Sequence, residues 1–351
     1  MTRRAAAFAI PGDLMTDTGG YRYDRRLLAE LRAMGGDVSH IALAGSFPEP
    51  SPADNSAAAE RLAAVPPGCP VIIDGLALGA MDRTVLSAMA APIVALVHHP
   101  LAREAGLDRA RRSQLYRSER DNLALAAHVI VSSPHTAALL SADYAVPADR
   151  ITVARPGSDR PSARVAKAEP PLILSVGIQV PRKGHDVLLR ALARVADRPW
   201  QAIIAGPALD RAHAGLLAGL REELGLVSRV RLAGRVPGDE LARRYGQASL
   251  FALATRYEGY GMVFDEAMAH GLPIVTCASG AVPATVAPGA GRLVPRDDPD
   301  AFAAALATLL DDGAARSAMA AASAAGGAAL AGWESTAQRV ATVLDGVAAG
   351  A

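Results

Sequence analysis

The sequence has 351 residues, of which 51% are hydrophobic and 20% charged, with a formal net charge of +1. This length exceeds what one hydrophobic core usually serves, and the composition excludes a disordered chain. The near-zero charge argues against sequence-independent nucleic-acid binding, so we expect small-molecule partners. The two cysteines, Cys69 and Cys277, form no disulfide framework or zinc-ligand pattern, which fits a reduced, cytoplasmic setting.

Short apolar runs that resemble buried strands recur through the first half of the sequence. Their apolar character is continuous rather than alternating, which indicates strands covered on both faces, as in a parallel sheet. A stretch with helical spacing follows the first run and ends at Gly35-Gly36. The predicted strands are residues 5–10, 38–43, 71–74, 93–98, 129–132 and 151–154.

The pattern restarts after residues 158–171, a segment rich in Pro, Ala and charge that we interpret as a linker. We predict an N-terminal Rossmann-like domain at 1–165, a C-terminal one at 170–330, and a final helix at 332–349 that packs back on the first domain. Two such α/β units bind ligands at the carboxyl ends of their strands. The predicted strands of the second half are residues 172–176, 202–205, 230–233, 250–254, 274–277 and 292–294.

The most informative segment, residues 258–266, directly follows a predicted strand and reads EGYGMVFDE. Gly259 and Gly261 allow close backbone approach at a strand-to-helix turn, where free amides can face a phosphate or a sugar hydroxyl. Glu258 lies in the turn and Glu266 slightly more than one turn into the helix. We therefore expect both carboxylates to point into one cleft and to accept hydrogen bonds from paired hydroxyls.

This segment, continued to residue 273, resembles the Glu-x7-Glu signature of retaining GT-B glycosyltransferases, in particular glycosyltransferase family 4. The resemblance extends over most of the chain, because further family motifs occur in the family's order. Such an ordered set is much more specific than any one motif. It implies a GT-B fold, in which two Rossmann-like domains face each other across a cleft. The motifs are Gly19-Gly20, Val97-His98, Pro156-Gly157 and Arg182-Lys183-Gly184, ahead of the Glu258 segment.

The resemblance also implies an activity: transfer of a hexose, with retention, from a nucleotide-sugar to a hydroxyl acceptor, with no metal or other cofactor. A UDP-sugar is the favoured donor. Lys183 would neutralise the diphosphate, Glu266 would bind the ribose, and Glu258 and His98 would lie near the donor sugar. The implied catalytic residues are His98, Lys183 and Glu258. The implied donor-binding residues are Gly19, Gly20, Gly177, Arg182, Lys183, Gly206, Glu258, Gly259, Tyr260, Gly261, Met262 and Glu266.

The sequence departs from the family pattern at two positions. Ile178 stands where many members have an Arg, so the phosphate clamp is incomplete unless Arg182 replaces that Arg. Ala284 follows Pro283 where relatives often have Glu, so this sequence lacks the carboxylate that makes the family's contact near the phosphates. Gly19-Gly20 is expected in a polar loop before the first helix, as part of the family loop that closes on the diphosphate.

Two other patterns are interpreted as structural. Asp298-Pro-Asp300 has a DxD spacing, but it precedes a predicted helix, so we interpret Asp300 as the N-cap and expect no metal site. The arginine-rich residues 103–120 also carry acidic residues, which favours a solvated helix, with weak peripheral membrane contact as the alternative. Residues 85–97, the longest strongly apolar stretch, are too few to span a bilayer, so no transmembrane segment is expected.

Two alternative functions stay open at this point. One is a non-catalytic nucleotide-sugar-binding module, against which the joint presence of His98, Lys183, Glu258 and Glu266 argues. The other is another GT-B enzyme, such as a nucleotide-sugar epimerase, although no epimerase acid–base set is evident. The acceptor, a small molecule, glycan or lipid, has no readable code in the first-domain loops. Backbone groups around Gly206 could read the nucleobase without informative side chains.

Overall fold

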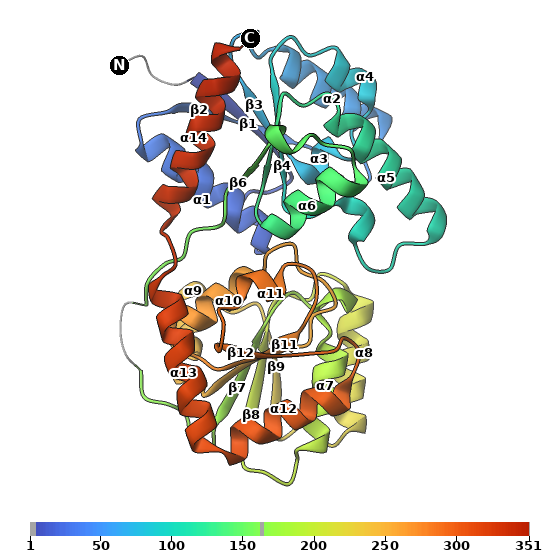
Figure 1. Cartoon of the computed structure of the whole chain (residues 1–351). Helices are drawn as coiled ribbons and strands as arrows, with labels where there is room; N and C mark the ends of the chain where they lie inside the picture. Colours follow the sequence, from blue (N-terminus) through green and yellow to red (C-terminus); the bar gives the residue numbers. More distant parts are fainter. Residues whose placement is uncertain (1–4, 162–164, 351) are drawn as a thin grey trace. The chain divides into compact units, whose positions relative to one another are not determined.

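The computed structural model of the chain describes residues 5–161 and 165–350, so residues 162–164 of the predicted linker lie outside the described part. The chain forms two compact units, both visible in Figure 1. Unit 1 runs to Gly157 and resumes at Ala331, and unit 2 comprises Ser158–Leu330. The C-terminal segment therefore belongs with the N-terminal half of the sequence.

Unit 1 is built on a parallel six-stranded sheet in the order β2-β1-β3-β4-β5-β6. Its central strands consist of apolar, largely β-branched residues, and all five residues of β4 are buried. Such strands need helices on both faces. The strands are β1 (Ala5–Pro11), β2 (Asp37–Leu43), β3 (Val71–Asp74), β4 (Ile93–Val97), β5 (His128–Val131) and β6 (Ile151–Val153).

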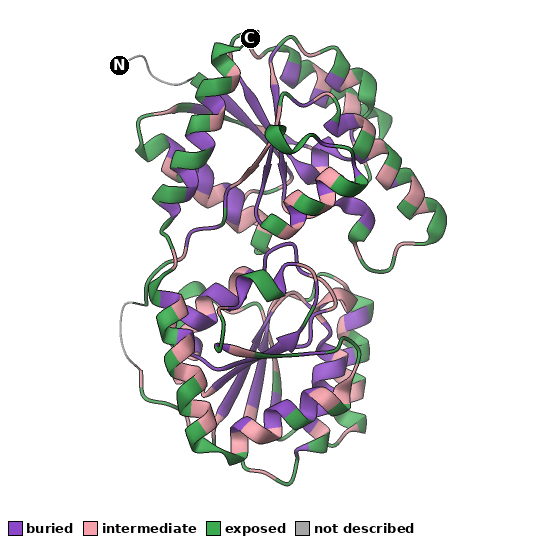
Figure 2. Ribbon diagram, in the orientation of Figure 1, coloured by how far each residue is buried: buried purple, intermediate pink, exposed green. Residues whose placement is uncertain are grey.

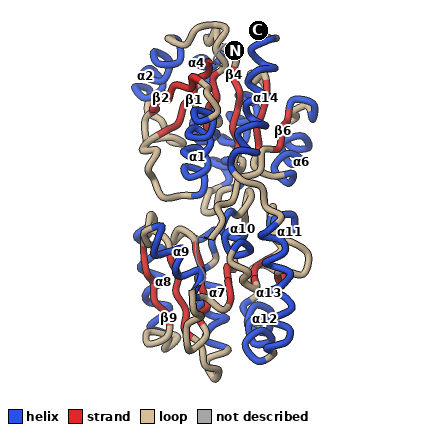
Figure 3. Tube along the Cα trace, turned by 90° about the vertical axis from the view of Figure 1, so that its left-hand side faces the viewer, coloured by secondary structure: helices blue, strands red, loops and turns tan. Residues whose placement is uncertain are grey.

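The helices of unit 1 alternate with these strands and lie on both faces of the sheet, as Figures 1 and 3 show. The last of them, α14, packs against α1. They are α1 (Gly19–Ala33), α2 (Pro52–Ala63), α3 (Gly75–Leu78), α4 (Arg83–Ser87), α5 (Arg109–Leu123), α6 (Pro134–Asp143) and α14 (Trp333–Ala349), with 3-10 turns η1 (Leu101–Arg103) and η2 (Ala148–Arg150).

Unit 2 repeats the plan with a parallel sheet in the order β12-β11-β10-β7-β8-β9. Its strands are β7 (Leu172–Val176), β8 (Gln201–Ala205), β9 (Val230–Gly234), β10 (Leu250–Leu253), β11 (Ile274–Cys277) and β12 (Gly291–Val294). Its helices are η3 (Pro181–Lys183), α7 (His185–Arg194), α8 (Arg211–Glu223), α9 (Gly238–Gln247), α10 (Met262–Ala269), α11 (Val282–Thr285), α12 (Pro299–Asp311) and α13 (Gly313–Ala328).

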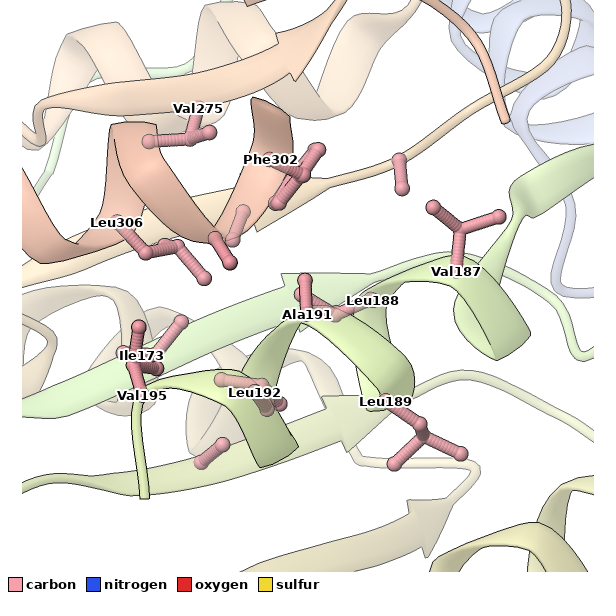
Figure 4. Close-up of a cluster of buried hydrophobic side chains, with 14 of the residues drawn as sticks. Ile173, Val187, Leu188, Leu189, Ala191, Leu192, Val195, Val275, Phe302 and Leu306 are labelled. Carbon is pink, nitrogen blue, oxygen red and sulfur yellow. The ribbon is translucent and has the colours of Figure 1, made fainter. Parts of the chain in front are cut away.

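Each unit has its own hydrophobic core, and burial is concentrated in its strands and in the helix faces turned toward them (Figure 2). In unit 2, α7 and α12 pack on one face of the sheet, with Leu188, Phe302 and Leu306 almost completely inaccessible (Figure 4). The 3.6-residue spacing of apolar residues along α7 places its branched side chains toward the strands. Within the described residues, no helix combines the length and apolarity needed to cross a bilayer.

Two local expectations are wrong. Gly19 and Gly20 do not lie in a loop but are the first two residues of α1, because Thr18 already has the extended dihedrals of an N-cap. The cap of α12 is Asp298 rather than Asp300, since Asp298 Oδ1 accepts hydrogen bonds from the amides of Asp300 and Ala301.

Candidate functional site

In unit 2 the predicted residues Arg182 and Lys183 both lie close to the buried carboxylate of Glu258, a third predicted residue. Lys183 Nζ lies 2.7 Å from Glu258 Oε1, and Arg182 Nη1 lies 3.7 Å from Oε2. The side chains of both cations are 11% exposed and that of Glu258 is 6% exposed. Lys183 ends the 3-10 turn after β7, and Glu258 lies in the loop between β10 and α10, where β10 pairs with β7. The neighbouring strands thus bring together residues that are distant in sequence.

Glu258 is held in its ionised form. Burial disfavours the charge, but Lys183 and then Arg182 outweigh burial, so the pKa of the Glu258 carboxyl lies below its usual value. A hydrogen bond of 2.9 Å from the Thr255 hydroxyl to Oε1 adds to this effect. The site therefore contains two cations close to one carboxylate, an arrangement suited to a ligand with both phosphate oxygens and hydroxyls.

The backbone of the two site loops is fastened together by hydrogen bonds. The Arg256 amide donates to the Arg182 carbonyl at 2.8 Å, and the Arg256 guanidinium binds Asp186 through two bonds of 2.9 Å. It also donates to the Pro181 carbonyl and to Asp297. Sequence reasoning missed Arg256, because nothing in the spacing shows that it reaches back to the turn that carries Lys183.

Glycines remove side chains from the loops beside this cluster. A Cβ on Gly177 would lie 3.2 Å from the Lys183 side chain, and a Cβ on Gly206 would overlap the Gly177 carbonyl. Gly206 has φ +149° and Gly184 has φ +64°, values that favour glycine. The amides of Gly177 and Gly206 both bond to neighbouring strand ends, at 2.9 and 2.8 Å. The backbone at these strand ends is therefore closely packed and has no side chains at the two glycines, and we call it the floor of glycine backbone.

The residues that follow Glu258 form the start of α10. Gly261 is its N-cap with φ +94°, and Met262 is the first helical residue. Gly259 is buried, and the Tyr260 hydroxyl donates to Asp265 at 2.6 Å. The Tyr260 hydroxyl is thus occupied within the protein, so its direct contribution to a ligand would come from the backbone or the ring. The loop after β11 supports the same turn, since the Ala281 amide donates to the Glu258 carbonyl at 2.9 Å.

Glu266 has partners different from those of Glu258. The Tyr245 hydroxyl donates to Glu266 Oε2 at 2.7 Å, and the Tyr245 ring stacks on His270 with centroids 5.2 Å apart. The spacing of Glu258 and Glu266 is as expected, with the first in the turn and the second in the helix. Tyr245 was missed from the sequence, because it lies on α9, in another α/β repeat.

In unit 1, His98 lies at the carboxyl end of β4 and meets two buried aspartates. Its Nε2 is 2.9 Å from Asp24 Oδ1 and 3.6 Å from Asp74 Oδ2. The first turn of α1 covers the ring, since a Cβ on Gly20 would lie 3.2 Å from His98 Cδ2, whereas Gly19 has open space. Sequence reasoning found His98 and the glycines but missed both aspartates.

The three groups Asp24, Asp74 and His98 offer ligand atoms within 4.8 Å of one another, a spacing that a cation could also use. The 2.9 Å separation of Nε2 and Asp24 Oδ1 is also that of a good hydrogen bond. We therefore interpret the cluster as a hydrogen-bonded one. The neighbouring His99 lies apart from it and pairs with Glu104 at 3.1 Å.

Unit 1 also has a hollow of about 590 Å³ between α2, α4 and α5. Two of its polar side chains are engaged inside the protein: Arg111 donates to the Pro48 carbonyl at 2.8 Å, and Asp82 caps α4. It contains none of the residues predicted from the sequence.

Known proteins resemble this chain in sequence and in fold. Residues 170–312, most of unit 2, match the family model described as glycosyl transferases group 1. The chain is 36% identical over 220 residues to D-inositol 3-phosphate glycosyltransferase of Thermobispora bispora, which covers 57% of this chain and 51% of the relative. It is 31% identical over 223 residues to the GDP-mannose-dependent alpha-(1-6)-phosphatidylinositol monomannoside mannosyltransferase of Mycolicibacterium smegmatis, covering 60% and 57%. The chain thus spans about half the length of the curated relatives it matches.

Solved structures resemble the whole chain. Sucrose-phosphate synthase from Thermosynechococcus elongatus has a TM-score of 0.85 at 22% identity and covers 99% of this chain and 100% of its own. Anabaena HepE, whose structure contains UDP and glucose, has a TM-score of 0.76 at 16% identity, with 98% and 100% covered. At these identities the likeness establishes the fold, and the predicted architecture of two Rossmann-like units is confirmed.

Proposed function

We propose that this chain, whose residues 170–312 match the family model of glycosyl transferases group 1 and whose fold is GT-B, transfers a hexose from a nucleotide-sugar to a hydroxyl acceptor. The observation that carries this proposal is the pairing of Lys183 and Arg182 with Glu258 beside a floor of glycine backbone. The same pairing is hard to explain as a stability device, because burying a charged pair costs desolvation.

We assign each residue of the cluster a task in the transfer. Loss of a nucleoside diphosphate builds negative charge on the leaving phosphate, and fixed cations at Lys183 and Arg182 would stabilise that charge without a metal. Arg182, whose Nη1 also donates to the Tyr257 carbonyl at 3.0 Å, would supply the positive charge of the family's Arg, which Ile178 replaces in this sequence. Glu258 would contact the donor sugar, and Glu266, oriented by Tyr245, would accept the ribose hydroxyls.

The amides at the start of α1, at Gly19 and Gly20, would contribute positive partial charge toward an anionic ligand. His98 would donate a hydrogen bond to the substrate, and the reaction would retain the anomeric configuration. Exclusion of water would protect the activated sugar from hydrolysis. The cytoplasmic location stays a prediction.

The nucleotide that this chain binds is to be identified by experiment, because the nucleotides named for the relatives and structural neighbours differ. One is named for GDP-mannose, and the HepE structure contains UDP and glucose. We take a UDP-sugar as the first donor to test. Thermal unfolding with UDP, GDP, ADP, UDP-glucose and GDP-mannose, all with EDTA, should give one class of nucleotide that stabilises the protein. A ligand at about a hundred times its dissociation constant adds roughly 2.7 kcal/mol.

The matched variants are Lys183→Ala and Lys167→Ala, both in unit 2. Lys183 pairs with Glu258, whereas Lys167 donates to the Ala248 carbonyl and takes no part in the cluster. The nucleotide shift should weaken in Lys183→Ala and persist in Lys167→Ala. Absence of any shift in the wild type would remove the donor site from the proposal. Loss of the shift on chelation would remove metal independence only.

A further inference from the structure

The cluster of His98, Asp24 and Asp74 in unit 1 places two buried carboxylates beside a single imidazole. Asp24 is 1% exposed and Asp74 2% exposed, and both lie within reach of the same ring nitrogen. Two carboxylates that cannot both ionise cheaply without solvent usually share a proton. The buried pair therefore indicates a device that sets the charge and orientation of His98.

The ring of His98 is fixed on three sides. Asp24 Oδ1 lies 2.9 Å from Nε2, the Tyr23 ring packs in a T-shaped contact at a centroid distance of 5.0 Å, and the backbone of Gly20 lies close to Cδ2. Among the described residues, no hydrogen bond engages Nδ1, and the side chain is 20% exposed. The edge of the ring with Nδ1 is therefore the part left for a ligand.

The other titratable groups facing this cluster are Tyr21 and Tyr23 of α1. Burial raises the pKa of Tyr21 to about 12, with further contributions from Asp74 and Asp24, and burial also raises the pKa of Tyr23. Both phenols are neutral near pH 7. The charges that decide the state of His98 are thus those of the two aspartates.

Burial, followed by the charge of Asp24, raises the pKa of Asp74 to about 8. Burial disfavours the charged imidazole, but Asp24 and Asp74 outweigh burial and raise the pKa of His98 above its ordinary value. The raised pKa of Asp74 favours its protonated form near pH 7, and the raised pKa of His98 favours the imidazolium that Nε2, 2.9 Å from Asp24 Oδ1, is placed to form.

We propose that Asp24 and Asp74 are positioning residues that keep His98 as a fixed imidazolium, so that its Nδ1–H is a permanent hydrogen-bond donor to substrate oxygen rather than a proton acceptor. The charged state follows from unit 1 alone, while its use toward a substrate rests on the proposed function. An imidazolium has no free lone pair, so His98 would stabilise oxygen charge and leave deprotonation of the acceptor to another group.

The test is a pH titration of the full-length protein labelled with ¹⁵N-histidine, with long-range ¹H–¹⁵N spectra. The chain has eight histidines, and the His98 signals are identified by their absence in His98→Gln. In the wild type both His98 nitrogens should remain protonated well above pH 6.5, the ordinary value. Wild-type titration near 6.5, or a nitrogen shifted by a bound cation, would overturn the proposal.

Asp24→Asn should lower the His98 titration midpoint by about 1 to 3 pH units, because it removes the nearest opposite charge. Glu30→Gln is the matched control on α1, since Glu30 pairs with Arg26 at 3.6 Å instead of His98, and it should leave the midpoint unchanged. An unchanged midpoint in Asp24→Asn would overturn the proposal. The other histidine signals report whether the variant is folded, and if it is not, the wild-type titration alone decides.

Nucleotide-induced stabilisation, measured in parallel with UDP on wild type and Asp24→Asn, keeps the two proposals separable. Asp24 lies in unit 1 and the cation pair in unit 2, so the shift should persist in the variant. If UDP and the other nucleotides stabilise neither protein, the donor site fails while the His98 titration still stands. If the shift persists and the titration is ordinary, the positioning role fails alone.

Discussion

At the scale of single residues, Glu119 of α5 gives a pH-dependent prediction. Its carboxyl accepts the Leu101 amide through both oxygens, at 3.2 and 3.0 Å, and is 1% exposed. Burial raises its pKa from the ordinary 4.5 to about 8, although the Leu101 amide and the Tyr144 hydroxyl act in the opposite direction. Between pH 4.5 and about pH 8, Glu119 has lost its proton in the unfolded chain but keeps it in the folded chain. The free energy of unfolding therefore falls as the pH rises through this range.

Glu119→Gln resembles the protonated acid and should remove this loss. Relative to wild type, the variant should gain up to about 4 kcal/mol between pH 5 and pH 8. The measurement is chemical unfolding of unit 1 at the two pH values. Glu60→Gln, at an exposed position of α2, should keep the pH dependence of the wild type. An equal stability difference between Glu119→Gln and wild type at both pH values would contradict this account.

Gly184 gives a second prediction at this scale, based on sterics. It has φ +64°, and a Cβ there would overlap the Ala254 carbonyl at the end of β10. Gly184→Ala should cost at least about 2 kcal/mol, since left-handed strain alone costs roughly 1 to 2 kcal/mol. It should also weaken nucleotide binding, because Gly184 directly follows Lys183. Urea unfolding and the nucleotide shift measure both effects.

The control for Gly184 is Gly219→Ala on α8. A Cβ on Gly219 meets nothing within 4 Å, so alanine should stabilise the helix by roughly 0.5 to 1 kcal/mol. If both variants have the same stability and bind the nucleotide equally, the close approach at Gly184 has no energetic role.

At the scale of elements, the sequence identifies most of the strands because buried parallel strands are continuous apolar runs. The run at 172–176 coincides with β7 and the run at 274–277 with β11. Helix starts are less predictable, since they depend on caps: Gly19 begins α1 although a glycine pair is typical of a turn. The cap of α12 fell two residues before its expected position for the same reason.

The site is predictable only where motifs are local. Glu258, Glu266 and Lys183 could be named because each lies in a short family motif. Asp24 and Asp74 could not, because they meet His98 only after α1, β3 and β4 have assembled. Pairing of distant elements leaves no spacing in the sequence, and Tyr245, the partner of Glu266 on α9, was missed for this reason.

The connection between elements of unit 2 gives a third prediction, at Arg256. Its guanidinium joins the loop after β10 to the start of α7 through a bidentate pair with Asp186. Lysine cannot reproduce this geometry, so Arg256→Lys should let the turn with Lys183 move. We expect the dissociation constant of the stabilising nucleotide to rise about tenfold, or ~1.4 kcal/mol, by calorimetry.

Arg194→Lys is the control, because Arg194 forms an exposed ion pair with Asp300 on the same unit. Exposed pairs contribute little, so its affinity should match wild type. Equal affinities for the Arg256 and Arg194 variants would show that the fastening of the loops does not position the cations.

At the scale of the whole molecule, the chain crosses from unit 2 back to unit 1 and ends there as α14. Trp333 anchors this return: it is 3% exposed, its ring makes a T-shaped contact with the Tyr23 ring at a centroid distance of 5.6 Å, and the Arg26 guanidinium lies 5.5 Å from its ring centroid. Tyr23 in turn packs on His98. The last helix therefore supports the same cluster that fixes the His98 ring, although it is the farthest element in sequence.

Trp333→Ala should destabilise unit 1 by about 3 to 5 kcal/mol, the usual cost of a buried large aromatic. The chain has two tryptophans, and the other, Trp200, is 2% exposed in the core of unit 2. In Trp333→Ala the remaining tryptophan fluorescence reports unit 2, whose midpoint and nucleotide shift should stay as in wild type. In Trp200→Ala the fluorescence reports unit 1, and the nucleotide shift should be reduced. Each unit has its own core, which is why the losses should separate; a common drop in both reporters would mean that the units unfold as one cooperative block.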